Sequence, residues 1–287
     1  MSNFKKRMES YRRHPGSFLL FLLVMLSALA TFVVLLFLIA YILIKGVPNL
    51  KLSLFSWTYT TENASMLPSI VNTLIMTVLS LLIAVPLGIF SAIYLTEYAK
   101  KGNKLVAVVR LTTETLSGIP SIVYGLFGSL FFVTYLKWSY SLAAGALTLA
   151  IMILPLVMRT TEEALKSVPD MYREGSFGLG AGKLHTVFCV VLPSAIPGIL
   201  SGVILSIGRI VGETAALIYT AGSIPQIPSS IMGSGATLAV HMYNLSKEGL
   251  YTDQAYAVAV VLLLLVLLIN WVSSRIGSVL CHSNSAE

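Results

Sequence analysis

Six long apolar runs divide the chain, and its polar residues gather between them. A helical segment of about 20 apolar residues crosses the hydrocarbon core of a bilayer, so each run is long enough to be a membrane span. The predicted spans are residues 18–44, 69–96, 111–136, 138–158, 193–221 and 255–274. The pattern therefore predicts an all-α membrane protein with about six transmembrane helices.

The first run follows a basic segment, as a cleavable signal sequence would. However, it continues uncharged over residues 18–44, which is about 27 residues or about 40 Å of helix. The apolar core of a signal sequence is only about 7–15 residues long, so we expect a retained first transmembrane helix. The predicted organisation is a tail at 1–17, this helix at 18–44, a five-helix core at 67–277 and a tail at 278–287.

Composition and charge support a lipid environment. Hydrophobic residues make up 56% of the chain and charged residues 11%, whereas charged residues are about 25% of an average soluble domain. The net charge of +7 does not indicate a nucleic-acid partner, because the cations lie between the apolar runs. Fourteen of the 19 lysines and arginines fall on one side of the six predicted spans and four on the other. The positive-inside rule then predicts a multi-pass protein with both termini in the cytoplasm.

The cytoplasmic segment 160–192 has a pattern of its own. Two helix-favouring stretches flank a turn that contains Gly178, Gly180 and Gly182. This pattern predicts a compact knob that could contact a partner. The glycines do not form a nucleotide-binding P-loop, because Lys183 is followed by leucine and not by serine or threonine. The predicted spans hold no catalytic or metal-binding constellation, so we expect neither enzyme activity nor a cofactor on this chain.

The same segment resembles the cytoplasmic signature of permease subunits of bacterial ABC importers. That signature reads Glu-Ala-Ala, three residues, Gly, nine residues, Ile, one residue, Leu-Pro. Here the corresponding residues are Glu174, Gly175, Ser176, Gly180, Val190, Leu192 and Pro193, so the spacing is kept while three residue types differ. The resemblance implies a type I ABC importer permease fold, also called MetI-like. It also implies that a separate ATPase docks on the segment through Arg173, Glu174, Gly175, Ser176, Gly180, Leu192 and Pro193.

Segments 117–128 and 208–216 resemble phosphate permeases, so the chain is similar to the A-type permease subunit of phosphate-specific ABC transporters. This resemblance implies ATP-driven import of inorganic phosphate by alternating access across a bacterial inner membrane. The implied partners are a second permease that completes a heterodimer, two copies of an ABC ATPase that bind ATP and Mg²⁺, and an extracytoplasmic phosphate-binding protein. Two alternatives stay open: a permease for sulfate or molybdate, and an ion-coupled secondary transporter, which usually shows an internal repeat that we do not find.

Charged and helix-breaking residues within the predicted spans are the candidates for a substrate path. Arg209 and Glu213 are four residues apart, so on one helix they would share a face and could pair. They could fix helix packing, or they could line the path, where a guanidinium suits a phosphate oxyanion. Gly118, Pro120 and Gly125 could break the third span or allow close helix packing, and we favour packing.

Overall fold

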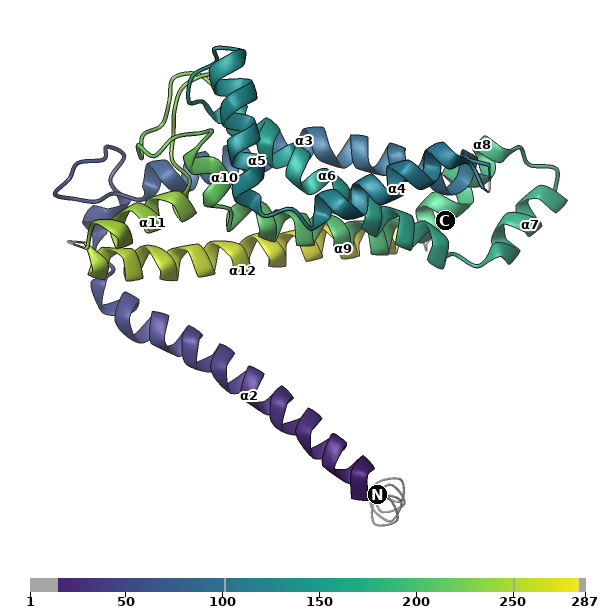
Figure 1. Cartoon of the computed structure of the whole chain (residues 1–287), viewed down its shortest axis with the longest axis horizontal. Coiled ribbons are helices and arrows are strands. Elements are labelled where there is room, and N and C mark those ends of the chain that lie inside the picture. The colour runs from purple at the N-terminus through teal and green to yellow at the C-terminus, as the bar shows by residue number, and fades with distance from the viewer. Residues whose placement is uncertain (1–14, 101, 250, 284–287) are drawn as a thin grey trace.

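The computed structural model describes residues 15–100, 102–249 and 251–283. Four long helices lie side by side in these ranges: α3 (Leu67–Ile93), α6 (Leu142–Ser167), α9 (Leu192–Val211) and α12 (Thr252–Ser283) (Figure 1). A fifth, α2 (Pro15–Gly46), projects away from one end of this bundle. The predicted all-α class is confirmed. Residues 1–14 of the predicted first tail and 284–287 of the second lie outside the described ranges.

Shorter elements occupy the two ends of the bundle. After α2 come two 3-10 helices, η1 (Val47–Asn49) and η2 (Leu52–Phe55). The end of the bundle where α2 joins it also carries α11 (Leu238–Glu248) and α10 (Ala215–Ile218). The opposite end carries the predicted knob, built from α7 (Asp170–Gly178), α8 (Lys183–His185) and a π-helical turn, η5 (Thr186–Val191). We call these the outer end and the knob end.

Small residues let the long helices pack closely. An added Cβ atom at Gly88 of α3 would collide with Val157 of α6, and one at Gly202 of α9 would collide with Thr160 of α6. In a membrane the hydrophobic effect does not drive helices together. Transmembrane helices associate instead through close van der Waals contacts, which small residues allow. α3, α6 and α9 therefore form a tightly joined unit.

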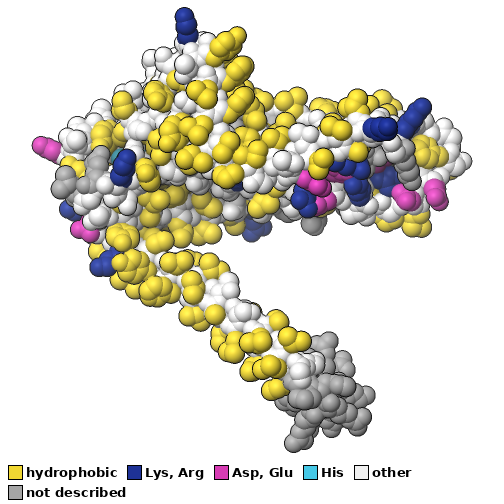
Figure 2. Space-filling model, viewed as in Figure 1, with side chains coloured by type: hydrophobic (Ala, Val, Ile, Leu, Met, Phe, Trp, Pro, Cys, Tyr) yellow, Lys and Arg dark blue, Asp and Glu magenta, His cyan; other side chains and the backbone are white. Residues whose placement is uncertain are grey.

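Exposed apolar side chains cover much of the bundle face in view and most of α2 (Figure 2). Five helices are long and apolar enough to cross a membrane, and a sixth span is obtained if one bent pair counts as a span. This agrees with the predicted number of about six. Most of the charged side chains in view gather toward the knob end, as the charge asymmetry of the sequence predicts (Figure 2).

The third predicted span is not one straight helix. α4 (Lys104–Ser117) ends before Pro120, and α5 (Ser121–Gly128) continues through a π-helical stretch, η4 (Ser129–Tyr135), at an angle of 102° to α4. Proline lacks a backbone N–H and forces the preceding residue out of the helical region, which explains the break. Our preference for packing alone at this position was therefore wrong.

The fifth predicted span is also interrupted. Its helical part runs from Lys183 through α9 to Val211, well before the predicted end at residue 221. Gly212 is the C-terminal cap of α9, and the short α10 begins only at Ala215. Arg209 lies in the last turn of α9 but Glu213 lies beyond it, so the two residues do not share a helix face as predicted.

The outer end is closed by buried polar contacts. The Asn72 side chain of α3 donates hydrogen bonds to the carbonyls of Gln226 (2.8 Å) and Ala236 (3.1 Å). The backbone N–H of Leu238 donates to the Thr73 hydroxyl at 2.9 Å. These contacts fix the long outer segment 222–237 onto the start of α3.

His241 of α11 contributes to the same closure. Its side chain is only 1% exposed, its Nε2 atom donates to the Ala64 carbonyl at 3.3 Å, and Tyr59 packs edge-on against its ring. Burial lowers the pKa of His241 below its ordinary 6.5. In the unfolded chain His241 therefore binds a proton at a higher pH than in the folded chain. As the pH falls below 6.5 toward the lowered pKa of the folded state, the unfolded state gains protons first and the folded state loses stability.

We predict that the midpoint of thermal unfolding in detergent falls between pH 7.5 and pH 5, and that His241→Gln reduces this fall. Glutamine can still donate to the Ala64 carbonyl but does not titrate. His185→Gln is the matched control, because His185 is exposed in the knob. An identical pH dependence in the wild type and His241→Gln would contradict the prediction.

Candidate functional site

The two interrupted spans meet at their breaks. α5 packs on α10 so closely that a Cβ atom on Gly125 would lie 2.7 Å from the Cα atom of Ala216. Tyr124 and Ile210, one beside each break, belong to the same buried apolar cluster. The glycine and proline of the third span thus have both predicted roles, since Pro120 breaks the helix and Gly125 allows the close approach. Gly118 caps the end of α4.

Two side chains satisfy backbone groups that the breaks leave open. The Tyr124 hydroxyl donates to the Leu116 carbonyl at the end of α4, at 2.8 Å. The Glu213 carboxylate accepts from the backbone N–H of Ala216 at the start of α10, at 3.0 Å. Because unpaired backbone groups are costly at membrane depth, these contacts stabilise irregular chain where a span would otherwise be continuous.

Arg209 and Glu213 have different surroundings. Glu213 is 9% exposed and held by its contact with Ala216. No ion pair joins it to Arg209 in the part of the chain that the structure describes. Arg209 is partly buried and lies near enough to Tyr124 for an electrostatic interaction. The guanidinium is therefore not neutralised by the carboxylate predicted to pair with it.

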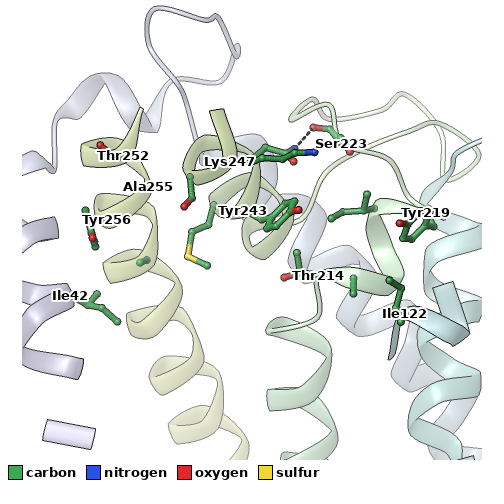
Figure 3. Close-up of a pocket in the computed structure, with 16 residues that line it drawn as sticks. Ile42, Ile122, Thr214, Tyr219, Ser223, Tyr243, Lys247, Thr252, Ala255 and Tyr256 are labelled. Carbon is green, nitrogen blue, oxygen red and sulfur yellow. Dashed lines mark hydrogen bonds between the residues drawn. The ribbon is translucent and has the colours of Figure 1, made fainter. Parts of the chain in front are cut away.

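A groove of about 690 Å³ opens beside the break of the fifth span (Figure 3). Thr214 and Ala215 reach it from that break, Ile122 from α5, and Tyr243 and Lys247 from α11. Hydroxyl, amide and ammonium groups line its outer part, where the Asn244 side chain donates to the Ser223 carbonyl at 3.1 Å. No local sequence pattern predicts this groove, because its lining residues come from five separate helices and the segments beside them.

The knob presents an apolar outer face. Leu179 is 92% exposed, and Met171, Tyr172 and Leu184 are also exposed. A concavity of about 710 Å³ lies between α7 and the following turn, lined in part by Gly175, Ser176 and Gly180. The knob holds its shape through the 2.9 Å contact between the hydroxyls of Ser176 and Thr186. Gly180 turns the chain with φ of +84°, a conformation that favours glycine.

The predicted docking residues do not all face outward. Glu174 is exposed, and a Cβ atom at Gly175 would meet nothing within 4 Å, so the chain itself does not require a glycine there. Leu192 packs against a buried cluster beneath the knob, and Pro193 lies in the first turn of α9. Arg173 points inward and forms an ion pair with Glu97 of the π-helical turn η3 (Tyr94–Tyr98) at 2.7 Å. In this chain the Arg173 charge is thus engaged by Glu97, and its contact with a docking partner stays a prediction.

Known proteins resemble this chain over most of its length. A permease from Bacillus subtilis, described as the probable ABC transporter permease protein YqgI, is 36% identical over 87% of this chain and 91% of its own. The phosphate transport system permease protein PstA of Pasteurella multocida is 38% identical over 79% of this chain and 81% of its own. The phosphate transport system permease protein PstA 2 of Mycobacterium bovis is 35% identical over 80% of this chain and 81% of its own length.

Solved transporters share the fold. The inward-facing MetNI methionine ABC transporter contains a chain that matches with a TM-score of 0.58, at 24% identity, over 74% of this chain and 93% of its own. A chain of a bacterial alginate ABC transporter in complex with a periplasmic protein matches with a TM-score of 0.59 at 19% identity. The match covers 86% of this chain and 95% of the other. These likenesses confirm the predicted permease fold.

A family model described as "binding-protein-dependent transport system inner membrane component" matches residues 84–280. That range contains the knob, both helix breaks and most of the groove. It covers more than half of the chain, and the relatives above are permease subunits of ABC transporters. This multi-pass membrane protein therefore belongs to the family of binding-protein-dependent transport system inner membrane components, the permeases of ABC importers.

Proposed function

We propose that the chain carries inorganic phosphate into the cell, as one permease of a heterodimer. The relatives whose names specify phosphate transport support this substrate. The structural observation that carries the proposal is the position of Arg209, a guanidinium without an ion-pair partner among the described residues, at the meeting point of two helix breaks. A charge within a membrane span usually faces a protein interior or a water-filled path.

The geometry of the breaks suits an oxyanion. Arginine presents N–H groups in a fork that matches phosphate oxygens. The N-terminus of α5 lies at its break, and the N-termini of interrupted membrane helices favour anionic groups. In this proposal Arg209 contacts phosphate, Glu213 holds the break in shape through Ala216, and the groove with Lys247 admits the anion from outside.

The energy comes from partner subunits. Two copies of an ABC ATPase bind ATP and Mg²⁺, and one of them docks on the exposed face of the knob. A second permease covers the face of this chain that completes the path, and an extracytoplasmic binding protein delivers phosphate at the outer end. Both termini lie in the cytoplasm, which the excess of lysine and arginine on that side supports. Closure of the ATPases moves the knob and opens the path outward.

Removing the positive charge at the breaks should impair transport. We predict that Arg209→Gln lowers phosphate uptake by the reconstituted complex about tenfold or more, because a hydrogen bond to a charged group contributes about 1.5–3 kcal/mol. Recovery of the ATPase with the complex should not change. Arg159→Gln is the matched control, since Arg159 is an exposed arginine of α6 paired with Glu163.

Uptake at the wild-type rate in Arg209→Gln would contradict the role of Arg209. The substrate itself is tested with the wild-type complex, by measuring uptake of phosphate, sulfate and molybdate in parallel. We expect phosphate to be preferred. Preferential uptake of sulfate or molybdate would favour the alternative oxyanion permease.

Gly175 tests the docking face. We predict that Gly175→Leu leaves the fold intact, because a Cβ atom at this position has no atom of this chain within 4 Å, but blocks the close approach of the ATPase. Recovery of the ATPase by affinity purification from solubilised membranes should fall about tenfold, a loss typical of a residue at the centre of an interface. Gly16→Leu in α2 is the control, since its Cβ atom also meets nothing. Equal recovery of the ATPase with Gly175→Leu and the wild type would count against the proposed dock.

A further inference from the structure

The knob is joined to α3 by a buried ion pair. Glu97 lies in the π-helical turn η3 that ends α3, and Arg173 lies in the middle of α7, 76 residues later. The Arg173 side chain is 15% exposed and that of Glu97 is 9% exposed. Because both side chains are largely buried and engage each other, the pair links two elements of this chain.

Arg173 uses every nitrogen of its guanidinium. The Nη2 atom donates to Glu97 at 2.7 Å and to the Leu165 carbonyl at 2.9 Å, and the Nε atom donates to Glu97 at 3.2 Å. The Nη1 atom donates to the Val168 carbonyl at 2.8 Å and to Asp170 at 3.2 Å. The Leu165 carbonyl lies in the last turn of α6, where its other hydrogen bond is a long one, 3.4 Å, from the capping N–H of Val168. One side chain thus holds the end of α6, the start of α7 and the end of α3.

The surroundings make this junction rigid. Ile93 of α3, Leu165 of α6 and Val191 before α9 form a buried apolar cluster at the knob end. A charge-assisted, forked hydrogen bond is directional as well as strong, and screening by water is weak where both partners are largely buried. A displacement of α7 is therefore expected to displace the end of α3 with it.

Apart from the apolar packing of η5 in that cluster, few side-chain contacts among the described residues join the knob to α3. Among the described residues, the hydrogen bonds between α7 and η3 all come from Arg173. The remaining polar contact is from α8, where the Lys183 ammonium lies 5.1 Å from the centre of the Tyr98 ring. By contrast, α7 follows α6 directly in the chain through Val168 and Pro169. The Arg173–Glu97 pair is thus the polar link between α7 and the end of α3, and a single side-chain substitution can remove it.

We propose that Arg173 is a positioning residue for energy coupling, which makes α3 move with the knob when the ATPase moves it. The proposal rests on the proposed function, because it requires that an ATPase moves the knob. α3 also carries Asn72 and Thr73, which hold the outer segment. Through the Arg173–Glu97 pair, motion of the knob reaches the contacts that close the outer end.

Loss of the pair should uncouple hydrolysis from transport. The chromosomal copy of the chain is tagged, the complex is purified from native membranes and reconstituted with its binding protein, and phosphate uptake and ATP hydrolysis are measured together. For Glu97→Gln we expect the ATPase to be recovered and ATP to be hydrolysed. Phosphate imported per ATP should fall about fivefold or more, the lower range of coupling between distant sites.

Arg173→Lys is the second variant. Lysine keeps the positive charge but has one ammonium, which cannot hold Glu97 and the carbonyls of Leu165 and Val168 together. We expect the same fall in the ratio. Glu163→Gln is the matched control, because it removes a carboxylate from an ion pair whose side chains are 60% and 64% exposed, and its ratio should equal that of the wild type.

The outcomes separate the two proposals. An unchanged ratio of phosphate to ATP in both Glu97→Gln and Arg173→Lys would overturn the coupling role. The coupling role would also be overturned if uptake, ATP hydrolysis and recovery of the ATPase all fell by the same factor, because that pattern indicates a fault in docking or folding. A wild-type complex without an ATPase or without phosphate uptake would overturn the proposed function itself, and the coupling role with it.

Discussion

Lipid offers no hydrogen bonds to a peptide backbone, and the rest of this structure depends on that constraint. Continuous helices satisfy it along most of the chain. Where two spans are interrupted, the protein must supply the missing partners, and it does so with the Tyr124 hydroxyl and the Glu213 carboxylate. The two breaks lie near each other, because α5 packs closely on α10 at Gly125 and Ala216. This place also holds Arg209 and Glu213, two charged residues within an apolar run, which makes it a candidate for a path.

The two ends of the bundle are mechanically connected. Glycine contacts hold α3 and α9 tightly against α6, so displacement at one end of these helices is carried to the other. At the knob end, Arg173 ties three helices together. At the outer end, Asn72 and Thr73 fix the loop that covers the bundle. An importer needs such a connection, because its energy source and its substrate entry lie on opposite sides of the membrane.

The sequence predicted what depends on local composition. Run lengths identified the spans, lysine and arginine identified the charged end, and the spacing from Glu174 to Pro193 identified the knob. It did not predict what depends on contacts between distant residues. Glu213 was assigned to a helix face because a charge in an apolar run does not reveal that the helix ends at Val211. The pairing of Arg173 was not predicted because its partner, Glu97, lies 76 residues earlier and nothing in the local pattern relates the two.

In the proposed mechanism, motion of the knob opens a path at the helix breaks. The most direct test places a cysteine at Thr214, which lines the groove, in a chain with Cys189→Ser and Cys281→Ser. In the reconstituted complex, the rate of reaction with a membrane-impermeant maleimide added from the outer side is measured with and without a non-hydrolysable ATP analogue. If the mechanism holds, labelling is faster when the nucleotide is bound. Equal rates in the two states, in a complex that retains its ATPase, would contradict it.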